Sequence, residues 1–186
     1  MKTLRLMSFA LIVLCSTYVA TALRAVCLVQ PNPGSSQPVT GVVKLEQACT
    51  TERLTINVKL SGFNTINATA GDPRLKHGFH VHEKGNLTGG CDSTLGHYNP
   101  FGVNHGGPDD AVRHVGDFGN IEQTPEGTVD VTITDRVASL FGTTTIIGRG
   151  LVVHSGEDDL GKGGQPSSLT TGNAGPRLGC CVITLA

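Results

Sequence analysis

The sequence lacks several features that mark common classes of protein. No two cysteines are spaced as Cys-x-x-Cys, which argues against a thiolate zinc site or a thioredoxin-like redox motif. Apart from a short apolar run near the start, no stretch approaches the roughly 20 apolar residues of a membrane span, so we expect no membrane partner. Lysine and arginine together number 14 against 15 acidic residues. Without a basic excess, nucleic acid and heparin are not expected partners.

Helical periodicity is also missing, and 25 glycines interrupt the 186-residue chain too often for long helices. Instead, residues 53–61 and 128–135 alternate apolar and polar side chains with the period of two that is typical of a half-buried strand. Further strands are predicted at 25–30, 39–46, 78–83, 117–123, 144–154 and 178–185. Eight short strands predict an all-β sandwich or barrel. The connections 84–116 and 155–176 are long enough to be two functional loops.

Residues 1–22 have the pattern of a secretory signal peptide. Lys2 and Arg5 precede an apolar run over residues 6–14, and Ala20-Thr21-Ala22 is a small-x-small cleavage site. We therefore expect a secreted, extracellular protein with one domain at 23–186. Two sequons, at Asn67 and Asn86, are candidate glycosylation sites and predict surface positions.

Secretion makes the cysteines informative, because disulfides persist in an oxidising compartment. Five cysteines remain after the predicted cleavage: Cys27, Cys49, Cys91, Cys180 and Cys181. An odd number leaves at least one of them outside any bridge within the chain. Their spacing alone does not decide the pairing.

The segment 97–117 is rich in histidine and poor in regular structure. It contains His97, His105 and His114, and Asp117 follows three residues after the last of these. Three imidazoles and one carboxylate can complete a tetrahedral zinc site without sulfur. The alternative is a solvated loop in which the histidines have no common role.

Three further histidines lie on predicted strands or at their ends. His80 and His82 are two residues apart, so they project from the same face of a strand with room for one metal between them, although a merely polar strand face is the alternative. His154 ends an apolar strand, where a lone histidine is more often a hydrogen-bonded structural residue. For His77 we expect a hydrogen-bonding role.

Two metal sites of four ligands each require one histidine to be shared. A bridging imidazolate is possible because each cation favours loss of the ring proton. A second site made entirely of nitrogen ligands suits Cu(II) in a flattened geometry. Its members would be His80, His82, His97 and His154. The spacing supports two metals, but it does not prove the bridge.

Seven segments, in order along the chain, resemble copper-zinc superoxide dismutase of the extracellular type: GFHVHE at 78–83, GHYNP at 96–100, HGGP at 105–108, RHVGDFGN at 113–120, GRGLVVH at 148–154, DDLGKGG at 158–164 and GNAGPRLGC at 172–180. The resemblance covers essentially all of the predicted mature chain. It implies an eight-stranded Greek-key β-barrel that disproportionates the superoxide anion to O2 and hydrogen peroxide by Cu(II)/Cu(I) cycling, in antioxidant defence. A non-catalytic copper-binding module is the alternative.

The resemblance also implies roles for individual residues. It places copper on His80, His82, His97 and His154, and zinc on His97, His105, His114 and Asp117. Asp158 stands where the family has a carboxylate that links a copper histidine to a zinc histidine. Arg177 stands where a guanidinium guides the anionic substrate, so His97 and Arg177 are the expected catalytic residues.

The same resemblance implies a disulfide between Cys91 and Cys180. Cys27 and Cys181 form a possible second bridge, which would leave Cys49 over. It also implies a homodimer, although Lys84, where relatives have an apolar interface residue, disfavours a dry contact.

Pro166, Ser167 and Thr170 depart from the pattern, because cytosolic relatives often carry two acids and a lysine there. We therefore expect weaker electrostatic steering, carried mainly by Arg177.

Overall fold

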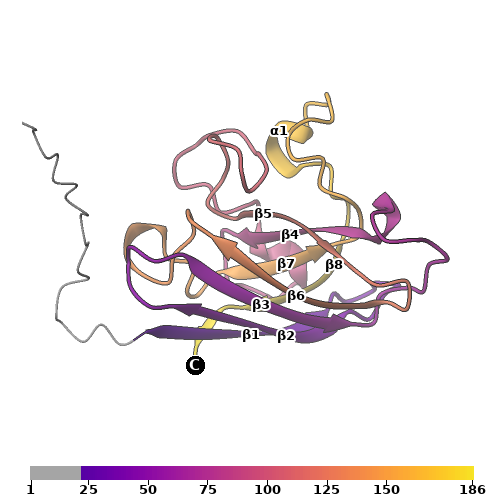
Figure 1. Ribbon diagram of the computed structural model, residues 1–186, viewed down its shortest axis with the longest axis horizontal. Coiled ribbons are helices and arrows are strands. Elements are labelled where there is room, and N and C mark those ends of the chain that lie inside the picture. The colour runs from indigo at the N-terminus through magenta and orange to yellow at the C-terminus, as the bar shows by residue number, and fades with distance from the viewer. Residues whose placement is uncertain (1–21) are drawn as a thin grey trace, which may run out of the picture.

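The alternating segments of the sequence form strands in the computed structural model, which describes residues 22–186 (Figure 1). The predicted signal peptide, except for Ala22, therefore lies outside the described residues. The strands are β1 (Leu23–Pro31), β2 (Thr40–Gln47), β3 (Leu54–Ser61), β4 (Lys76–His82), β5 (Asp117–Glu122), β6 (Thr128–Asp135), β7 (Gly150–His154), β8 (Arg177–Val182) and β9 (Thr184–Leu185). Helical structure in this part is confined to α1 (Ser168–Thr171) and to single 3₁₀ turns at Pro73–Leu75, Cys91–Thr94 and Gly142–Thr144.

The strands form a nearly closed antiparallel barrel, which confirms the predicted fold class. Their order is β5-β4-β7-β8-β1-β2-β3-β6, and β9 pairs with β1 beside this path. Strand β3 pairs with β6, and β4 pairs with β7, so neighbours in the barrel are not always neighbours in sequence, as in a Greek key. No ladder between β5 and β6 joins the two ends of this order in the described residues.

The core lies inside the barrel, where alternate residues of each strand meet. In β3, Leu54, Ile56, Val58 and Leu60 are all buried, as their spacing predicts. The predicted strand 144–154 is shorter than expected. Residues 142–144 form a 3₁₀ turn, and Gly148, at φ +79°, turns the chain before β7 begins.

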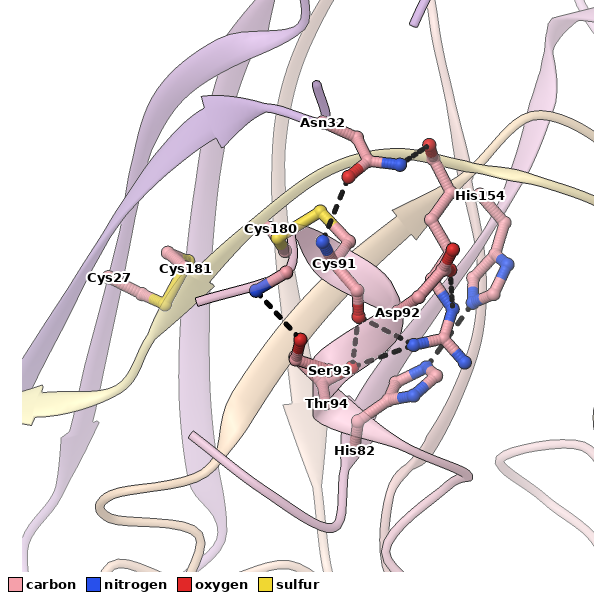
Figure 2. Close-up of a disulfide and its surroundings, with 12 residues drawn as sticks. Cys27, Asn32, His82, Cys91, Asp92, Ser93, Thr94, His154, Cys180 and Cys181 are labelled. Atoms are coloured by element: carbon pink, nitrogen blue, oxygen red, sulfur yellow. Dashed lines mark hydrogen bonds and ion pairs between the residues drawn. A yellow bond between two sulfur atoms is a disulfide. The ribbon is translucent and has the colours of Figure 1, made fainter. Parts of the chain in front are cut away.

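Two disulfides attach β8 to other parts of the fold. Cys27 on β1 bonds to Cys181, and Cys91 bonds to Cys180 (Figure 2). Cys49 takes part in neither bridge and is buried, with its Sγ 3.2 Å from Thr51 Oγ1. None of the helices among the described residues is long and apolar enough to span a membrane.

Candidate metal centre

Two neighbouring strands and the long loop between β4 and β5 bring the first group of histidines together. Strand β4 carries His80 and His82, and β7, which pairs with β4, ends at His154. The loop after β4 folds back so that His97 forms an isolated β-bridge with His82. All four side chains are buried, and each offers a ligand atom within 4.8 Å of those of the others. The Nε2 atoms of His82 and His154, for example, are 3.3 Å apart.

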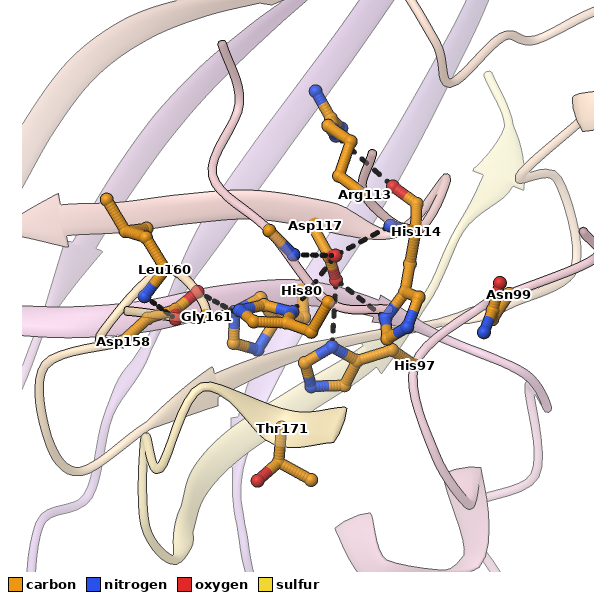
Figure 3. Close-up of polar contacts among 12 residues, drawn as sticks. His80, His97, Asn99, Arg113, His114, Asp117, Asp158, Leu160, Gly161 and Thr171 are labelled. Carbon is orange, nitrogen blue, oxygen red and sulfur yellow. Dashed lines mark hydrogen bonds and ion pairs between the residues drawn. The ribbon is translucent and has the colours of Figure 1, made fainter. Parts of the chain in front are cut away.

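The second group surrounds Asp117, the first residue of β5 (Figure 3). Its Oδ1 lies 2.8 Å from His97 Nδ1 and 3.1 Å from His114 Nδ1, and its Oδ2 lies 2.9 Å from His105 Nδ1. The backbone amides of Gly106 and His114 also donate to Oδ2. The ligand atoms of these four buried side chains also lie within 4.8 Å of one another, so the loop histidines are not solvated.

His97 belongs to both groups, and its two ring nitrogens face different ways. Nδ1 lies at Asp117 in the second group, whereas Nε2 is buried and has no hydrogen-bond partner among the described residues. His80 Nδ1 is likewise buried without a hydrogen bond, whereas His105 Nδ1 lies 2.9 Å from Asp117 Oδ2. Buried imidazole nitrogens without partners are costly unless a ligand occupies the space they face, so these nitrogens fit a metal ion in the first group. The three imidazole nitrogens that converge on the Asp117 carboxylate form a donor set that fits a second.

The other histidines of the two groups each use one nitrogen to hold the ring in place. A neutral imidazole that donates from one nitrogen presents a lone pair on the other. The acceptors are Asp158 Oδ2 for His80 Nε2, Leu95 O for His82 Nδ1, Gly175 O for His154 Nδ1, Asp158 Oδ1 for His105 Nε2, and Val103 O for His114 Nε2. The nitrogens left over are those that point into the two groups.

Asp158 links the groups from outside, with each carboxylate oxygen 2.8 Å from one histidine (Figure 3). It is itself held by the backbone amide of Leu160, which donates to Oδ1. Gly172, at φ +62°, lies against this carboxylate, and a Cβ there would collide with Asp158 and with His105. Residue 172 must therefore be glycine for the linking carboxylate to fit.

Arg177 opens β8 at the mouth of the first group. Its Nη1 donates to Cys91 O (2.6 Å) and to Thr94 Oγ1 (2.9 Å; Figure 2). Its Nη2 donates to Leu95 O (2.6 Å). A pocket of about 320 Å³ leads from solvent to this point. The residues that line it are His82, Gly96, His97, His154, Thr171, Asn173, Gly175 and Arg177.

Comparison with known proteins identifies this arrangement. The family model for copper/zinc superoxide dismutase matches residues 39–183. The chain belongs to the copper/zinc superoxide dismutase family. It is 46% identical over 162 residues to superoxide dismutase [Cu-Zn] of Candida glabrata, covering 87% of this chain and 97% of the relative. It is 48% identical over 156 residues to extracellular superoxide dismutase [Cu-Zn] of Drosophila melanogaster, covering 84% and 81%. The chain is thus a superoxide dismutase whose cofactors are copper and zinc and whose substrate is superoxide.

Burial and hydrogen bonding set the protonation states of this dismutase site. Burial lowers the pKa of His80 and His82 well below the usual value, and that of His154 to about 4. Burial also lowers the pKa of His105, but hydrogen bonds to the two aspartates outweigh it and raise the value to about 9. Hydrogen bonds to three histidines outweigh the burial of Asp117 and hold its pKa well below the usual range. Without metal, the first group therefore presents neutral imidazoles at neutral pH, whereas the second group pairs an ionised Asp117 with a protonated His105.

The remaining sequence predictions fall outside the two groups. His77 donates or accepts at both nitrogens, 2.9 Å from His154 O and 2.8 Å from Gln123 Oε1. Asn67 and Asn86 are both exposed. The resemblance implied the Cys91–Cys180 bridge beside Arg177, but sequence reasoning missed the atoms that hold the guanidinium directly, namely Cys91 O, Thr94 Oγ1 and Leu95 O. Two of these acceptors are backbone carbonyls, which no side-chain pattern reveals.

Proposed function

We propose that this chain is a secreted copper/zinc superoxide dismutase of the extracellular type. We also propose which group of residues holds which metal. Copper is held by His80, His82, His97 and His154, and zinc by His97, His105, His114 and Asp117. The all-nitrogen group suits Cu(II), and the group with a carboxylate suits zinc. The observation that carries the proposal is His97, the one member common to both groups.

When bound, copper supplies the one-electron chemistry that oxidises one superoxide to O2 and reduces a second, with two protons, to hydrogen peroxide. His97 Nε2, which has no partner among the described residues, takes up a proton between the two half-reactions and returns it as one of the two protons of the peroxide, and solvent water supplies the other. Its Nδ1 stays directed at the zinc group throughout, so the ring does not lose its orientation. Asp158 fixes the His80 and His105 rings from outside.

Arg177 binds the substrate anion and holds it at the mouth of the copper group. Its guanidinium is charged at any physiological pH, and three contacts with the segment 91–95 fix its position. Of the described residues that line the pocket, it is the one with a permanent positive charge. It therefore concentrates anions where the histidines converge.

Anomalous X-ray scattering at the copper and zinc absorption edges tests the assignment directly. Copper is expected at the group of His82 and His154, and zinc at the group of His105 and His114, with about one of each per chain. Copper at both groups, with no zinc, would contradict it. Copper held in its group without superoxide turnover would instead favour the non-catalytic module.

Secretion is supported by the signal pattern of residues 1–22, by two disulfides, and by the similarity to a relative named as extracellular. Expression in a eukaryotic secretory host tests it. We expect enzyme in the medium, with an N-terminus at Leu23. We also expect glycans at Asn67 and Asn86, so that Asn67→Gln and Asn86→Gln each reduce the mass. Retention of uncleaved protein in the cells would contradict the proposal.

We also propose a homodimer, by analogy with the family. Lys84 is exposed and forms an ion pair with Glu83, and the nearby Asn86 is exposed as well. A dimer contact must therefore accommodate a charge and a possible glycan. Sedimentation equilibrium distinguishes a dimer from a monomer.

A further inference from the structure

The guanidinium of Arg177 has few donors left for an anion. Arginine carries five N–H groups. Both N–H groups of Nη1 and one of Nη2 donate to Cys91 O, Thr94 Oγ1 and Leu95 O. The Nε–H and the second N–H of Nη2 remain, and a bound anion must use these two.

Asp92 lies beside one of these two donors. Its Oδ1 is 3.5 Å from Arg177 Nε, which is within reach of an ion pair but too long for a good hydrogen bond (Figure 2). The Asp92 side chain is 85% exposed, whereas that of Arg177 is 19% exposed. No other hydrogen bond or ion pair of the Asp92 carboxylate is found in residues 22–186. The carboxylate is thus loosely held and free to move away into solvent.

We propose that Asp92 is an internal competitor of the anionic substrate for Arg177. Its carboxylate carries the same charge as superoxide and faces the same Nε–H. An arriving anion must displace it or accept a weakened attraction, so Asp92 lowers the affinity of the pocket for every small anion. This inference rests on the role of Arg177 proposed above. It makes Asp92 a residue that tunes the strength of anion binding without touching a metal.

A structural role for Asp92 is the competing explanation. Asp92 lies in the first turn of the 3₁₀ segment Cys91–Thr94, where an acid favours the helical N-terminus. In that case its removal lowers stability and leaves anion binding unchanged. The two explanations therefore differ in what they predict for binding.

Azide titration of the metal-loaded protein, followed by the visible absorption of copper at low ionic strength, distinguishes them. Asp92→Asn should lower the azide Kd about two- to fivefold, the size expected for one exposed charge close to the binding donors. Asp130→Asn is the matched control, because it removes an exposed acid that pairs with Lys59 on β3, among the outward-facing residues of β6. The control should leave the Kd unchanged. An unchanged or raised Kd in Asp92→Asn overturns the proposal, whatever happens to stability.

Arg177→Met separates this inference from the proposed function. If it leaves azide affinity unchanged, the role of Arg177 itself fails. If it weakens binding while Asp92→Asn has no effect, the role of Arg177 stands and the inference about Asp92 fails. In the double variant, the gain from Asp92→Asn should disappear, because the carboxylate then has no guanidinium to occupy. A gain that persists would show that Asp92 acts as a bare charge on the pocket, which also overturns competition for Arg177.

Discussion

Strands β2, β3 and β6 alternate between buried and more exposed residues, whereas β4 is buried at six consecutive positions and β7 along its whole length. The difference follows from what covers each half of the barrel. We call the half with β4, β5 and β7 the covered half and the half with β2, β3 and β6 the uncovered half. Figure 1 shows α1 and its loop on the side of β4 and β5, away from β1 and β2. The uncovered half is stabilised by an apolar interior. The covered half buries charged and imidazole groups, which is tolerable only because they are hydrogen-bonded and converge on metal positions. Substitutions in the two halves should therefore have different consequences.

The largest effect is expected for His97→Ala in the covered half. Because this residue alone offers nitrogen atoms to both groups, its loss should reduce superoxide turnover about 100-fold or more and change the metal content. Pulse radiolysis and elemental analysis measure the two quantities.

Ile56→Val on β3 is the matched change in the uncovered half. It should lower the free energy of unfolding by about 0.5–1.5 kcal/mol and leave metal content and turnover as they are. Near-normal turnover in His97→Ala, or altered metal content in Ile56→Val, would break the division between the halves.

The two disulfides offer a second test of the difference between the two halves of the barrel, because they lie in different surroundings. The Cys27–Cys181 bridge lies in the main apolar core and closes 154 residues, and the Cys91–Cys180 bridge closes 89 and joins the site loop to β8. Replacing either pair with serine should cost about 2–5 kcal/mol of unfolding free energy.

Only the loss of Cys91–Cys180 should also weaken azide binding, because Cys91 O positions Arg177. Denaturant unfolding and azide titration of both double variants test this. Equal effects on azide binding would show that the bridge beside Arg177 has no special role.

The difference between the covered and uncovered halves of the barrel also explains which features could be predicted from the sequence. Alternation revealed β3 and β6, and the spacing of His80 and His82 revealed one face of β4, because these signals are local. Counting histidines indicated that one had to be shared, the two ligand sets proposed from the residues shared His97, and the family resemblance implied the same residue. Asp92 and the carbonyls that hold Arg177 come from a segment more than 80 residues earlier in the chain. No local pattern records such contacts, since they arise only when the loop is bonded to β8.

Acid should destabilise the metal-free protein through the covered half. His154 has a pKa of about 4 when folded and near 6.5 when unfolded, so between these values the unfolded chain binds more protons. His154 alone should lower the free energy of unfolding by on the order of 3 kcal/mol as the pH decreases from about 6.5 through 4, and His80 and His82 act in the same direction. His105 acts with the opposite sign, because its pKa is raised to about 9 in the folded protein. Its contribution to the free energy of unfolding is complete below about pH 6.5 and is lost as the pH rises through 9.

Urea unfolding of the metal-free protein at several pH values should therefore show maximum stability near pH 6.5. In His154→Gln the loss on the acid side should be smaller. An identical acid limb in the variant would exclude His154 as its source.

The smallest effect concerns steering at the rim of the covered half. Thr170 is exposed one residue before Thr171, which lines the pocket, and Arg177 is the permanent cation among the described lining residues. Thr170→Lys should raise kcat/KM up to about threefold at low ionic strength, and the gain should vanish near 0.5 M salt, where the screening length falls to a few ångströms. Thr132→Lys places the same charge at an exposed position on β6 and should have little effect at any salt concentration. If turnover of the unmodified enzyme already falls with salt as steeply as that of Thr170→Lys, then Arg177 is not the main source of attraction, and cations farther from the pocket must guide the anion.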